Sequence, residues 1–396
     1  MKNLFKKLTC VMVVAFVALS LFSCALTPQT QLKFTAFPEA EYNVGEVTEA
    51  EFLEAVKVEL DGKEITLNTL KGLGATITGI HLDQTGTYTL VVNYEGVSIV
   101  FEYDVVGLYE ASLNGVNYES LVEAFNEAAN LEEQAEIILL KNVQVAEKTL
   151  EVKKTANIKL NLNGKLLYSV SESAGGSYLL RNYGTLEIVG SSGSISFLAK
   201  YPDTDWGTEG YPGYASNTIS NYGNLTVDGD IVIENQTPRG GASYAIDNYA
   251  GSSLTVNNGT IKQTGGDIAI RMFSSSATSA INVVINGGTI IGRRAIWLHL
   301  AGSNAEVASL LNLTINGGVF STTDPNQPLI YEYSYGNSHA NTNIVINDGV
   351  FNSSSIQLCG GYKGDAPQLT VNGGTFEFDI IQWTEEGYEV LYSANK

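Results

Sequence analysis

The side chains with the clearest chemical pattern are aromatic, and they recur at one position in six of seven related segments between residues 180 and 360. Each segment contains an aliphatic residue, and the position three residues later holds Tyr183, Tyr222, Tyr249, Phe273, His299, Tyr333 or Cys359. The position directly after the aliphatic residue adds Arg181, Asp247, Arg271, Trp297 and Tyr331. On a strand whose aliphatic residue points inward, both positions face outward. A row of rings on a flat sheet suits stacking against the apolar C–H faces of sugars.

This pattern makes seven aromatic residues the candidate ligand-binding set: Tyr183, Tyr222, Tyr249, Phe273, Trp297, Tyr331 and Tyr333. Two other interpretations remain open from the sequence. The rings could stack on one another and only stabilise the protein. If the strand register is shifted by one residue, the rings point inward and are buried in the core. The position between the two outward ones holds Asn182, Asn221 and Asn248, which predicts an internal ladder of amides.

A charged pair on the same face is the best candidate for catalysis. Asp247 and Arg271 occupy equivalent positions in adjacent segments, so they should lie side by side, with His299 one segment further. Glycosidases need two carboxyl groups flanking the scissile bond, and the sequence shows no cluster of carboxylates around this pair. A salt bridge between neighbouring strands explains Asp247 and Arg271 equally well. The sequence therefore favours binding over catalysis. If the protein is an enzyme, Asp247, Arg271 and His299 are the candidate catalytic residues.

An insertion at residues 199–216 is the candidate metal site. It carries Asp203, Asp205 and Glu209 at two- and four-residue steps, a spacing that suits a calcium loop. Gly207 stands where a further ligand belongs, so the match is incomplete. Acidic and aromatic side chains together also suit glycan binding, which adds Trp206 to the candidate ligand-binding residues. A solvated loop without a ligand is the alternative. Calcium is thus the one cofactor that the sequence suggests.

The elements that must position these residues form an internal repeat. Seven times the chain reads apolar-x-apolar, and in six of these copies Asn or Asp, then Gly, and then a β-branched or aromatic residue follow. The second apolar anchors are 25 to 39 residues apart: Ile188, Val227, Val256, Ile285, Ile315, Ile346 and Val371. Self-similarity at this period indicates a stacked array of coils.

Two further apolar elements recur in each repeat. One centres on Leu180, Ile219, Ile246, Ile270, Ile296, Ile330 and Ile356, and the other on Ile195, Ile231, Ile261, Ile290, Phe320, Phe351 and Phe376. Three short strands per repeat are typical of a right-handed parallel β-helix, here of about eight coils, with each strand about 4.8 Å from its equivalent. The Asn-Gly-Gly corners supply residues that accept a positive φ at a recurring bend.

This part of the chain, residues 110–396, resembles the pectate-lyase-like superfamily of β-helices, and in detail the helix-capped β-helices of bacterial surface proteins. Polysaccharide lyases of that superfamily use calcium-ligating carboxylates and an Arg or Lys base on neighbouring coils. The resemblance therefore implies three function classes: adhesion or glycan binding, a polysaccharide lyase or glycoside hydrolase, and a structural stalk. Residues 117–135 have helical periodicity, with Asn117 or Ser120 as the N-cap, and are expected to cover the first coil.

Residues 34–107 show short strands with period-2 alternation, which predicts a small antiparallel sandwich. The anchors Val56, Val58 and Leu60 precede a turn at residues 61–62, after which Ile65 and Leu67 resume the pattern. Residues 42–46 and 83–88 resemble bacterial Ig-like domains of surface proteins, in which Tyr88 would be the tyrosine-corner residue. The resemblance implies a spacer or adhesion module without catalysis.

Residues 1–23 predict a targeting segment, with Lys2, Lys6 and Lys7 before an apolar run that is too short for a mature transmembrane helix. Residues 21–24 resemble the bacterial lipobox, which implies that Cys24 is lipidated and becomes the first mature residue. An ordinary secretory signal is the alternative. Residues 24–33 then form a tether, and the lipid is the only predicted membrane attachment, at the extracellular face of a bacterial membrane.

The formal charge of −20 argues against nucleic acid and anionic lipid as partners. With Cys10 in the signal and Cys24 lipidated, Cys359 has no intramolecular partner, so the exported protein must fold without disulfides. We therefore predict an all-β, lipid-anchored surface protein whose partner is a glycan or a protein of a host or other cell surface.

Overall fold

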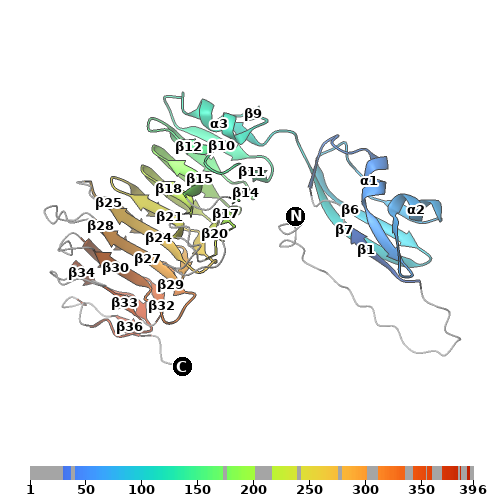
Figure 1. Ribbon diagram of the computed structural model, residues 1–396. Helices are drawn as coiled ribbons and strands as arrows, with labels where there is room; N and C mark the ends of the chain where they lie inside the picture. The colour runs from blue at the N-terminus through green and yellow to red at the C-terminus, as the bar shows by residue number, and fades with distance from the viewer. Residues whose placement is uncertain are drawn as a thin grey trace, which may run out of the picture. The chain divides into compact units, whose positions relative to one another are not determined.

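The computed structural model describes residues 30–36, 41–172, 176–200, 216–238, 242–274, 279–300, 311–334, 342–353, 355–358, 368–381, 384 and 390–392. The chain divides into two compact units, Met1–Leu108 and Tyr109–Lys396 (Figure 1). The targeting segment and Cys24 lie outside the described residues. Within the described ranges, every helix falls short of the length and apolar character that a membrane-spanning helix needs.

The first unit contains two small sheets and two short helices. Its four-stranded sheet has the order β2 (Glu41–Asn43), β7 (Val97–Val106), β6 (Gly86–Tyr94) and β5 (Thr76–Thr78). Its three-stranded sheet has the order β1 (Leu32–Ala36), β3 (Lys57–Leu60) and β4 (Lys63–Thr66). The helices are α1 (Glu49–Ala55) and α2 (Leu67–Gly72). Side chains from both helices and both sheets share one core, which includes Phe52, Leu70, Leu90 and Tyr103.

The two helices depart from the predicted sandwich of strands. The turn at Asp61 is present, but Leu67 begins α2 and does not continue a strand. Thr66 caps α2 because its hydroxyl accepts a hydrogen bond from the Thr69 amide. Thr48 caps α1 in a reciprocal pair with Glu51. The local capping signals therefore outweigh the alternation of apolar residues.

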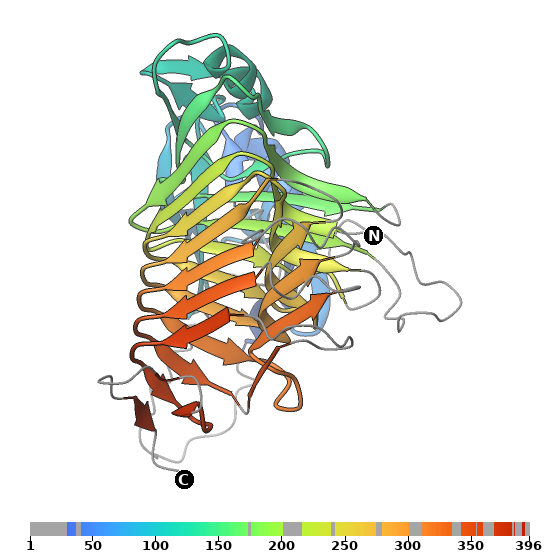
Figure 2. The same ribbon diagram turned by 90° about the vertical axis from the view of Figure 1, so that its left-hand side faces the viewer.

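The second unit consists of three long stacks of strands, an arrangement consistent with a parallel β-helix (Figures 1 and 2). The eleven-stranded sheet has the order β34 (Gln368–Val371), β31 (Thr342–Ile346), β28 (Leu311–Ile315), β25 (Ile281–Ile285), β22 (Ser253–Val256), β19 (Asn224–Gly229), β16 (Thr185–Gly190), β13 (Asn157–Asn161), β10 (Ala135–Leu139), β8 (Ala111–Leu113) and β9 (Val116–Tyr118).

The ten-stranded sheet has the order β11 (Val143–Gln144), β14 (Leu166–Ser171), β17 (Ser194–Ala199), β20 (Val232–Asn235), β23 (Thr260–Gln263), β26 (Thr289–Gly292), β29 (Val319–Thr322), β32 (Val350–Asn352), β35 (Thr375–Phe376) and β36 (Leu391–Tyr392). The eight-stranded sheet has the order β12 (Leu150–Val152), β15 (Ser177–Asn182), β18 (Ser216–Asn221), β21 (Ser243–Tyr249), β24 (Ile268–Ser274), β27 (Arg294–Leu300), β30 (Ile330–Ser334) and β33 (Ile356–Gln357).

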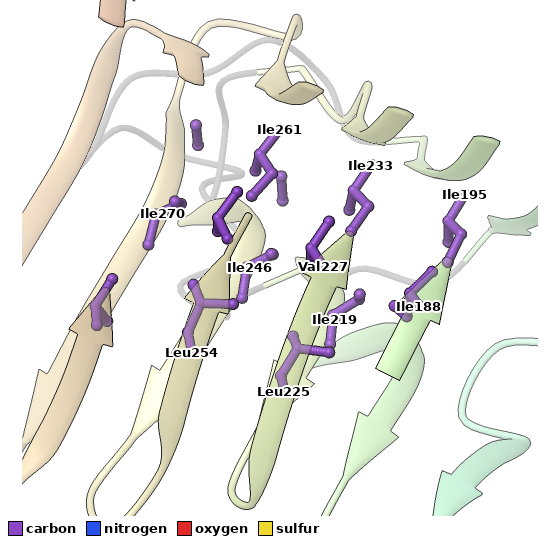
Figure 3. Packing of buried hydrophobic residues seen from close by; sticks show 14 of the residues in the cluster. Ile188, Ile195, Ile219, Leu225, Val227, Ile233, Ile246, Leu254, Ile261 and Ile270 are labelled. Carbon is purple, nitrogen blue, oxygen red and sulfur yellow. The ribbon is translucent and has the colours of Figure 1, made fainter. Parts of the chain in front are cut away.

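The strand register follows the repeat. Ile188 pairs with Val227 and Leu180 pairs with Ile219, as the alignment of the repeats predicts. The third element differs in one coil, where Ile233, and not Ile231, pairs with Ile195. Figure 3 shows these aliphatic side chains from the three sheets meeting in one core. Toward the C-terminal end the core holds a stack of buried rings, with centroids 5.0 Å apart for Phe320–Phe351 and 4.5 Å apart for Phe351–Phe376.

The helix at the N-terminal end of the stack is shorter than the predicted range of 117–135. It is α3 (Leu121–Ala128), and it packs against β8, β10 and β12 (Figure 1). Asn117 lies in β9, because the turn at Asn114 and Gly115 folds the preceding residues into a hairpin. Ser120 occupies the N-cap position, but its side chain makes no capping hydrogen bond.

Amides and glycines shape the corners as the sequence predicts. The side-chain amide of Asn182 donates to Asn221 at 2.9 Å, and that of Asn221 donates to Asn248 at 2.9 Å, so the internal ladder is confirmed. All three asparagines are fully buried. At the Asn-Gly-Gly corners, Gly288 and Gly318 have φ values of +84° and +104°, which residues with a Cβ rarely adopt.

Candidate ligand-binding face

The outward side of the eight-stranded sheet carries most of the aromatic side chains that face outward in the described strands. We call this side the aromatic face, and its rings are Tyr178, Tyr183, Tyr222, Tyr244, Tyr249, Phe273, Trp297, His299, Tyr331 and Tyr333. The outward positions of the other two sheets in the middle coils hold polar, charged or aliphatic residues, for example Thr226 and Thr255 on the eleven-stranded sheet and Glu234 and Lys262 on the ten-stranded sheet. Rings are therefore concentrated on one of three faces.

The N-terminal half of this face is a stack of tyrosines. The ring centroids of Tyr183 and Tyr222 are 5.1 Å apart with planes 25° from parallel, and those of Tyr222 and Tyr249 are 4.2 Å apart with planes 5° from parallel. Tyr222 is therefore covered by a ring on each side. Tyr183 ends the stack and is 38% exposed. The sequence left open whether the rings stack on one another, and in this half they do.

The C-terminal half makes mainly edge contacts. Tyr249 meets Phe273 at 6.0 Å and 86°, and Phe273 meets His299 at 5.0 Å and 62°. His299 stacks on Trp297 of the same strand at 4.3 Å and 8°. Tyr331 and Tyr333, on the next strand, are 6.1 Å apart. Both arrangements are favoured by the quadrupole of aromatic rings. All these rings are partly exposed, so the predicted outward register is correct for them.

The two candidate catalytic residues Asp247 and Arg271 form a buried ion pair. The Nε and Nη2 atoms of Arg271 donate to the two carboxylate oxygens at 2.7 and 2.6 Å. Asp247 also accepts from the side-chain amide of Asn217 at 3.2 Å. Although they occupy outward positions, Asp247 is fully buried and Arg271 is 7% exposed. Both carboxylate oxygens thus serve as hydrogen-bond acceptors for fixed donors.

The arginines of this face also lie against rings. The guanidinium of Arg271 is 4.1 Å from the ring centroid of Tyr244 and 4.4 Å from that of Phe273. Arg181 lies 3.9 Å from the Tyr178 ring and donates to the Tyr183 hydroxyl at 3.2 Å. These distances are those of cation–π contacts. At the C-terminal end of this face, the guanidinium of Arg294 lies 4.0 Å from the ring centroid of Tyr331.

Burial changes the acid–base behaviour of several groups. It lowers the pKa of His299 to about 3, with a further contribution from the positive charge of Arg271, so the imidazole is neutral at pH 7. Burial raises the pKa of Tyr249, and the negative charge of Asp247 adds to this effect. Burial and a hydrogen bond to Glu151 raise the pKa of Tyr178 to about 12. At neutral pH this face therefore presents uncharged rings and phenol hydroxyls beside its arginines.

His299 is placed differently from the ion pair. It pairs in register with Phe273, whereas Arg271 pairs with Trp297. Its ring contacts Phe273 and Trp297. The structure thus brings Asp247 and Arg271 into direct contact and places His299 among the rings of the C-terminal half.

The predicted calcium ligands Asp203, Asp205 and Glu209 lie outside the described residues, as does Trp206. In the part of the chain that the structure covers, no group of three or more His, Cys, Asp or Glu side chains is arranged to hold a metal ion.

Sequence reasoning missed Tyr178 and Tyr244, which stand two residues before the aliphatic anchors Leu180 and Ile246. Strict alternation would place them on the inward side with the anchors. The alternation is interrupted because Leu179 and Ala245, directly before the anchors, are also in the core. Tyr244 is fully buried beneath Arg271, which only the three-dimensional arrangement reveals.

No protein-family model matches the chain, and no curated protein matches it.

Proposed function

We propose that this protein binds glycans without cleaving them, and that the aromatic face is the binding surface. The observation that carries the proposal is the concentration of outward rings on one sheet, while the outward positions of the neighbouring sheets are largely polar or aliphatic. Rings serve the core of a protein only when they point inward. Partly exposed rings in a row suit the apolar faces of sugar rings.

We propose Tyr183 as the ring against which a sugar stacks. The inner tyrosines of the stack already contact rings on both sides, whereas Tyr183 has one ring neighbour among the described residues. A sugar that lies on Tyr183 continues the stack by one member. Arg181 and Glu151 are 3.8 Å apart beside it and supply a donor and an acceptor for sugar hydroxyls. Phe273, Trp297, Tyr331 and Tyr333 then provide a second contact region.

We further propose the architecture that presents this face. The second unit is a right-handed β-helix with three strands per coil, and the first unit is an Ig-like spacer. The hydroxyl of Tyr88 donates to the carbonyl of Gln84 at 3.1 Å, a contact that supports the tyrosine-corner assignment. Lipidation of Cys24 anchors the chain to the outer face of a bacterial membrane. Radiolabelled palmitate that enters the wild-type chain but not the Cys24→Ala variant would support the anchor, and equal labelling of both would reject it.

The test of the binding proposal is a glycan array probed with the full mature chain, with and without calcium. The Tyr183→Ala variant should lose at least tenfold in affinity for any hit. The matched control is Tyr168→Ala, because Tyr168 is also partly exposed but lies in β14 on the ten-stranded sheet. Equal binding by both variants would reject the aromatic face. Binding to a cell-surface protein and to no glycan would also reject the glycan proposal, and binding to neither would leave a structural stalk.

A polysaccharide lyase or glycoside hydrolase is the second candidate. The observation that favours it is a neutral imidazole, His299, on the same face as the buried Asp247–Arg271 pair. Neutral histidine can accept a proton from a substrate, but the low pKa of His299 makes it a weak base at pH 7. Product analysis of each array hit distinguishes the two functions, because cleavage yields shortened chains with new reducing or unsaturated ends.

A further inference from the structure

We infer that Asp247 and Arg271 are positioning residues that fix the orientation of the rings on the aromatic face. The inference rests on the proposed glycan-binding function, and it assigns the ion pair a role that differs from catalysis. Three sets of contacts carry it: the hydrogen bonds that converge on Asp247, the rings on each side of Arg271, and the place of the pair within the row of rings.

Asp247 is the point where donors from the two neighbouring strands converge. It accepts from Arg271 of β24 at 2.7 and 2.6 Å and from Asn217 of β18 at 3.2 Å. Hydrogen bonds to an ionised, buried acceptor are the strongest of their kind. Asp247 thereby holds the Arg271 guanidinium 6.0 Å from the centroid of the Tyr249 ring, and that ring lies parallel to Tyr222 at 4.2 Å.

Arg271 fixes the other half of the face. Its guanidinium lies between the rings of Tyr244 and Phe273, at 4.1 and 4.4 Å. Phe273 meets Tyr249 edge-on and also contacts His299. The ion pair therefore stands where the stacked tyrosines give way to edge contacts. A change at this point alters the orientation of rings in both halves.

Stability alone does not account for such a pair. Desolvation of two charges offsets much of their attraction, and apolar residues of similar volume often replace a buried pair without loss of stability. The same replacement would remove the cation that lies between the rings of Tyr244 and Phe273. A variant with both residues replaced thus separates the positioning role from a merely structural one.

The experiment compares the double variant Asp247→Leu/Arg271→Met with wild-type full chain. The control is Asp324→Leu/Arg293→Met, which removes an ion pair of 3.5 Å near the same sheet. Thermal unfolding checks that each variant folds, near-ultraviolet circular dichroism reports the coupling of the stacked rings, and calorimetry measures affinity for the array hit. We expect the first variant to melt near the wild-type temperature, to lose the ring signal and to lose at least tenfold in affinity. The control variant should keep both the ring signal and the affinity of the wild type.

Retention of the ring signal and the affinity by the folded double variant would overturn the inference. If that variant does not fold, Arg271→Lys takes its place, since lysine keeps the charge but cannot make two parallel hydrogen bonds or fill the space between the rings. The same loss of ring signal is then expected, and a wild-type spectrum would overturn the inference. If wild-type protein binds no glycan, the proposed function fails, and the ring signal alone decides whether the pair orients the rings.

Discussion

The rings of Tyr222 and Tyr249 lie face to face, with centroids 4.2 Å apart and planes 5° from parallel. The two residues come from adjacent strands and are 27 positions apart in the chain, so the repeat itself brings them into contact. Each ring covers one face of the other. Among the described residues, the surface offered to a ligand in this half therefore consists of ring edges and hydroxyls, together with the face of Tyr183 that is turned away from Tyr222.

Replacement of the middle ring should weaken the protein as well as its binding. Tyr222→Ala removes contacts with two rings, and we expect a loss of about 2–4 kcal/mol in the free energy of unfolding. Tyr168→Ala is the matched control, because Tyr168 is also partly exposed but lies in β14 on the ten-stranded sheet, and its loss should be about 1 kcal/mol or less. Chemical denaturation measures the free energy of unfolding of both variants. Equal losses would show that ring stacking contributes nothing beyond burial.

Single replacements in the Asp247–Arg271 pair should cost more than the double replacement. Asp247→Leu leaves the largely buried Arg271 charge over the Tyr244 ring without its carboxylate partner, and a loss of about 3–5 kcal/mol is expected from removal of one member of a buried pair. Replacing both members by apolar residues should restore most of that stability. A double-mutant cycle by chemical denaturation gives the coupling energy. Additive effects would mean that the two charges do not stabilise each other.

His299 should make the protein less stable in acid. The folded pKa is about 3 and the ordinary value is 6.5, so between these values the unfolded chain binds a proton that the folded chain does not. The contribution of His299 to stability is therefore complete above pH 6.5 and is lost as the pH falls toward 3. Its size is on the order of a few kcal/mol.

Stability measured from pH 7 to pH 4 checks this prediction. The His299→Gln variant, which has no proton to gain, should lose less stability over that range than wild type. Asp267 acts in the opposite direction, because burial raises its pKa to about 6 and its contribution decreases as the pH rises from 4 to 6. The Asp267→Asn variant should therefore lose stability more steeply than wild type as the pH falls. Parallel curves for His299→Gln and wild type would contradict the buried, neutral imidazole.

The internal and outer asparagine ladders should differ in how much they contribute to the free energy of unfolding. In the internal ladder, Asn221→Ala removes one hydrogen-bond partner each from the Asn182 amide, the Asn248 carbonyl oxygen and the Ser253 carbonyl, in buried or partly buried surroundings. Each unsatisfied group costs about 1–3 kcal/mol. In the outer ladder, the side-chain amide of Asn316 donates to Asn286 at 2.8 Å at an exposed corner. Water can replace that contact, so Asn316→Ala should cost about 1 kcal/mol or less. Equal costs, measured by chemical denaturation, would refute the distinction between buried and exposed amides.

The sequence predicts the repeat well because the stacking register depends on apolar residues at fixed spacing. Ile188, Leu180 and their equivalents pair as the alignment indicates. The error at Ile231 has a local cause. The preceding corner at Gly229 has a φ of +117° and leaves Ile231 buried before β20 begins, so two residues compete for one apolar position. Spacing alone cannot decide between Ile231 and Ile233.

The candidate site was predictable in its positions but not in its contacts. Alternation along the strand placed Tyr222 and Trp297 outward, and the equivalence of segments placed Asp247 beside Arg271. The burial of that pair depends on Tyr244 and Phe273, whose rings lie on both sides of the guanidinium. In the first unit, a capping box at Thr48 and Glu51 marked α1, although the alternation of apolar residues suggested strands only.

The helix at the end of the stack should be required for a soluble fold. Phe125 of α3 is 2% exposed and belongs to the core of the second unit, together with Leu121 and Ala128. Phe125→Ala should therefore destabilise this unit by about 3–5 kcal/mol and expose apolar surface to the dye ANS. The matched control is Val122→Ala on the same helix, where the side chain is only partly buried and the expected loss is about 1 kcal/mol. Thermal unfolding, dye fluorescence and light scattering measure the effect. A wild-type melting temperature for Phe125→Ala would show that the strands of the first coil are stable without the packing of this helix.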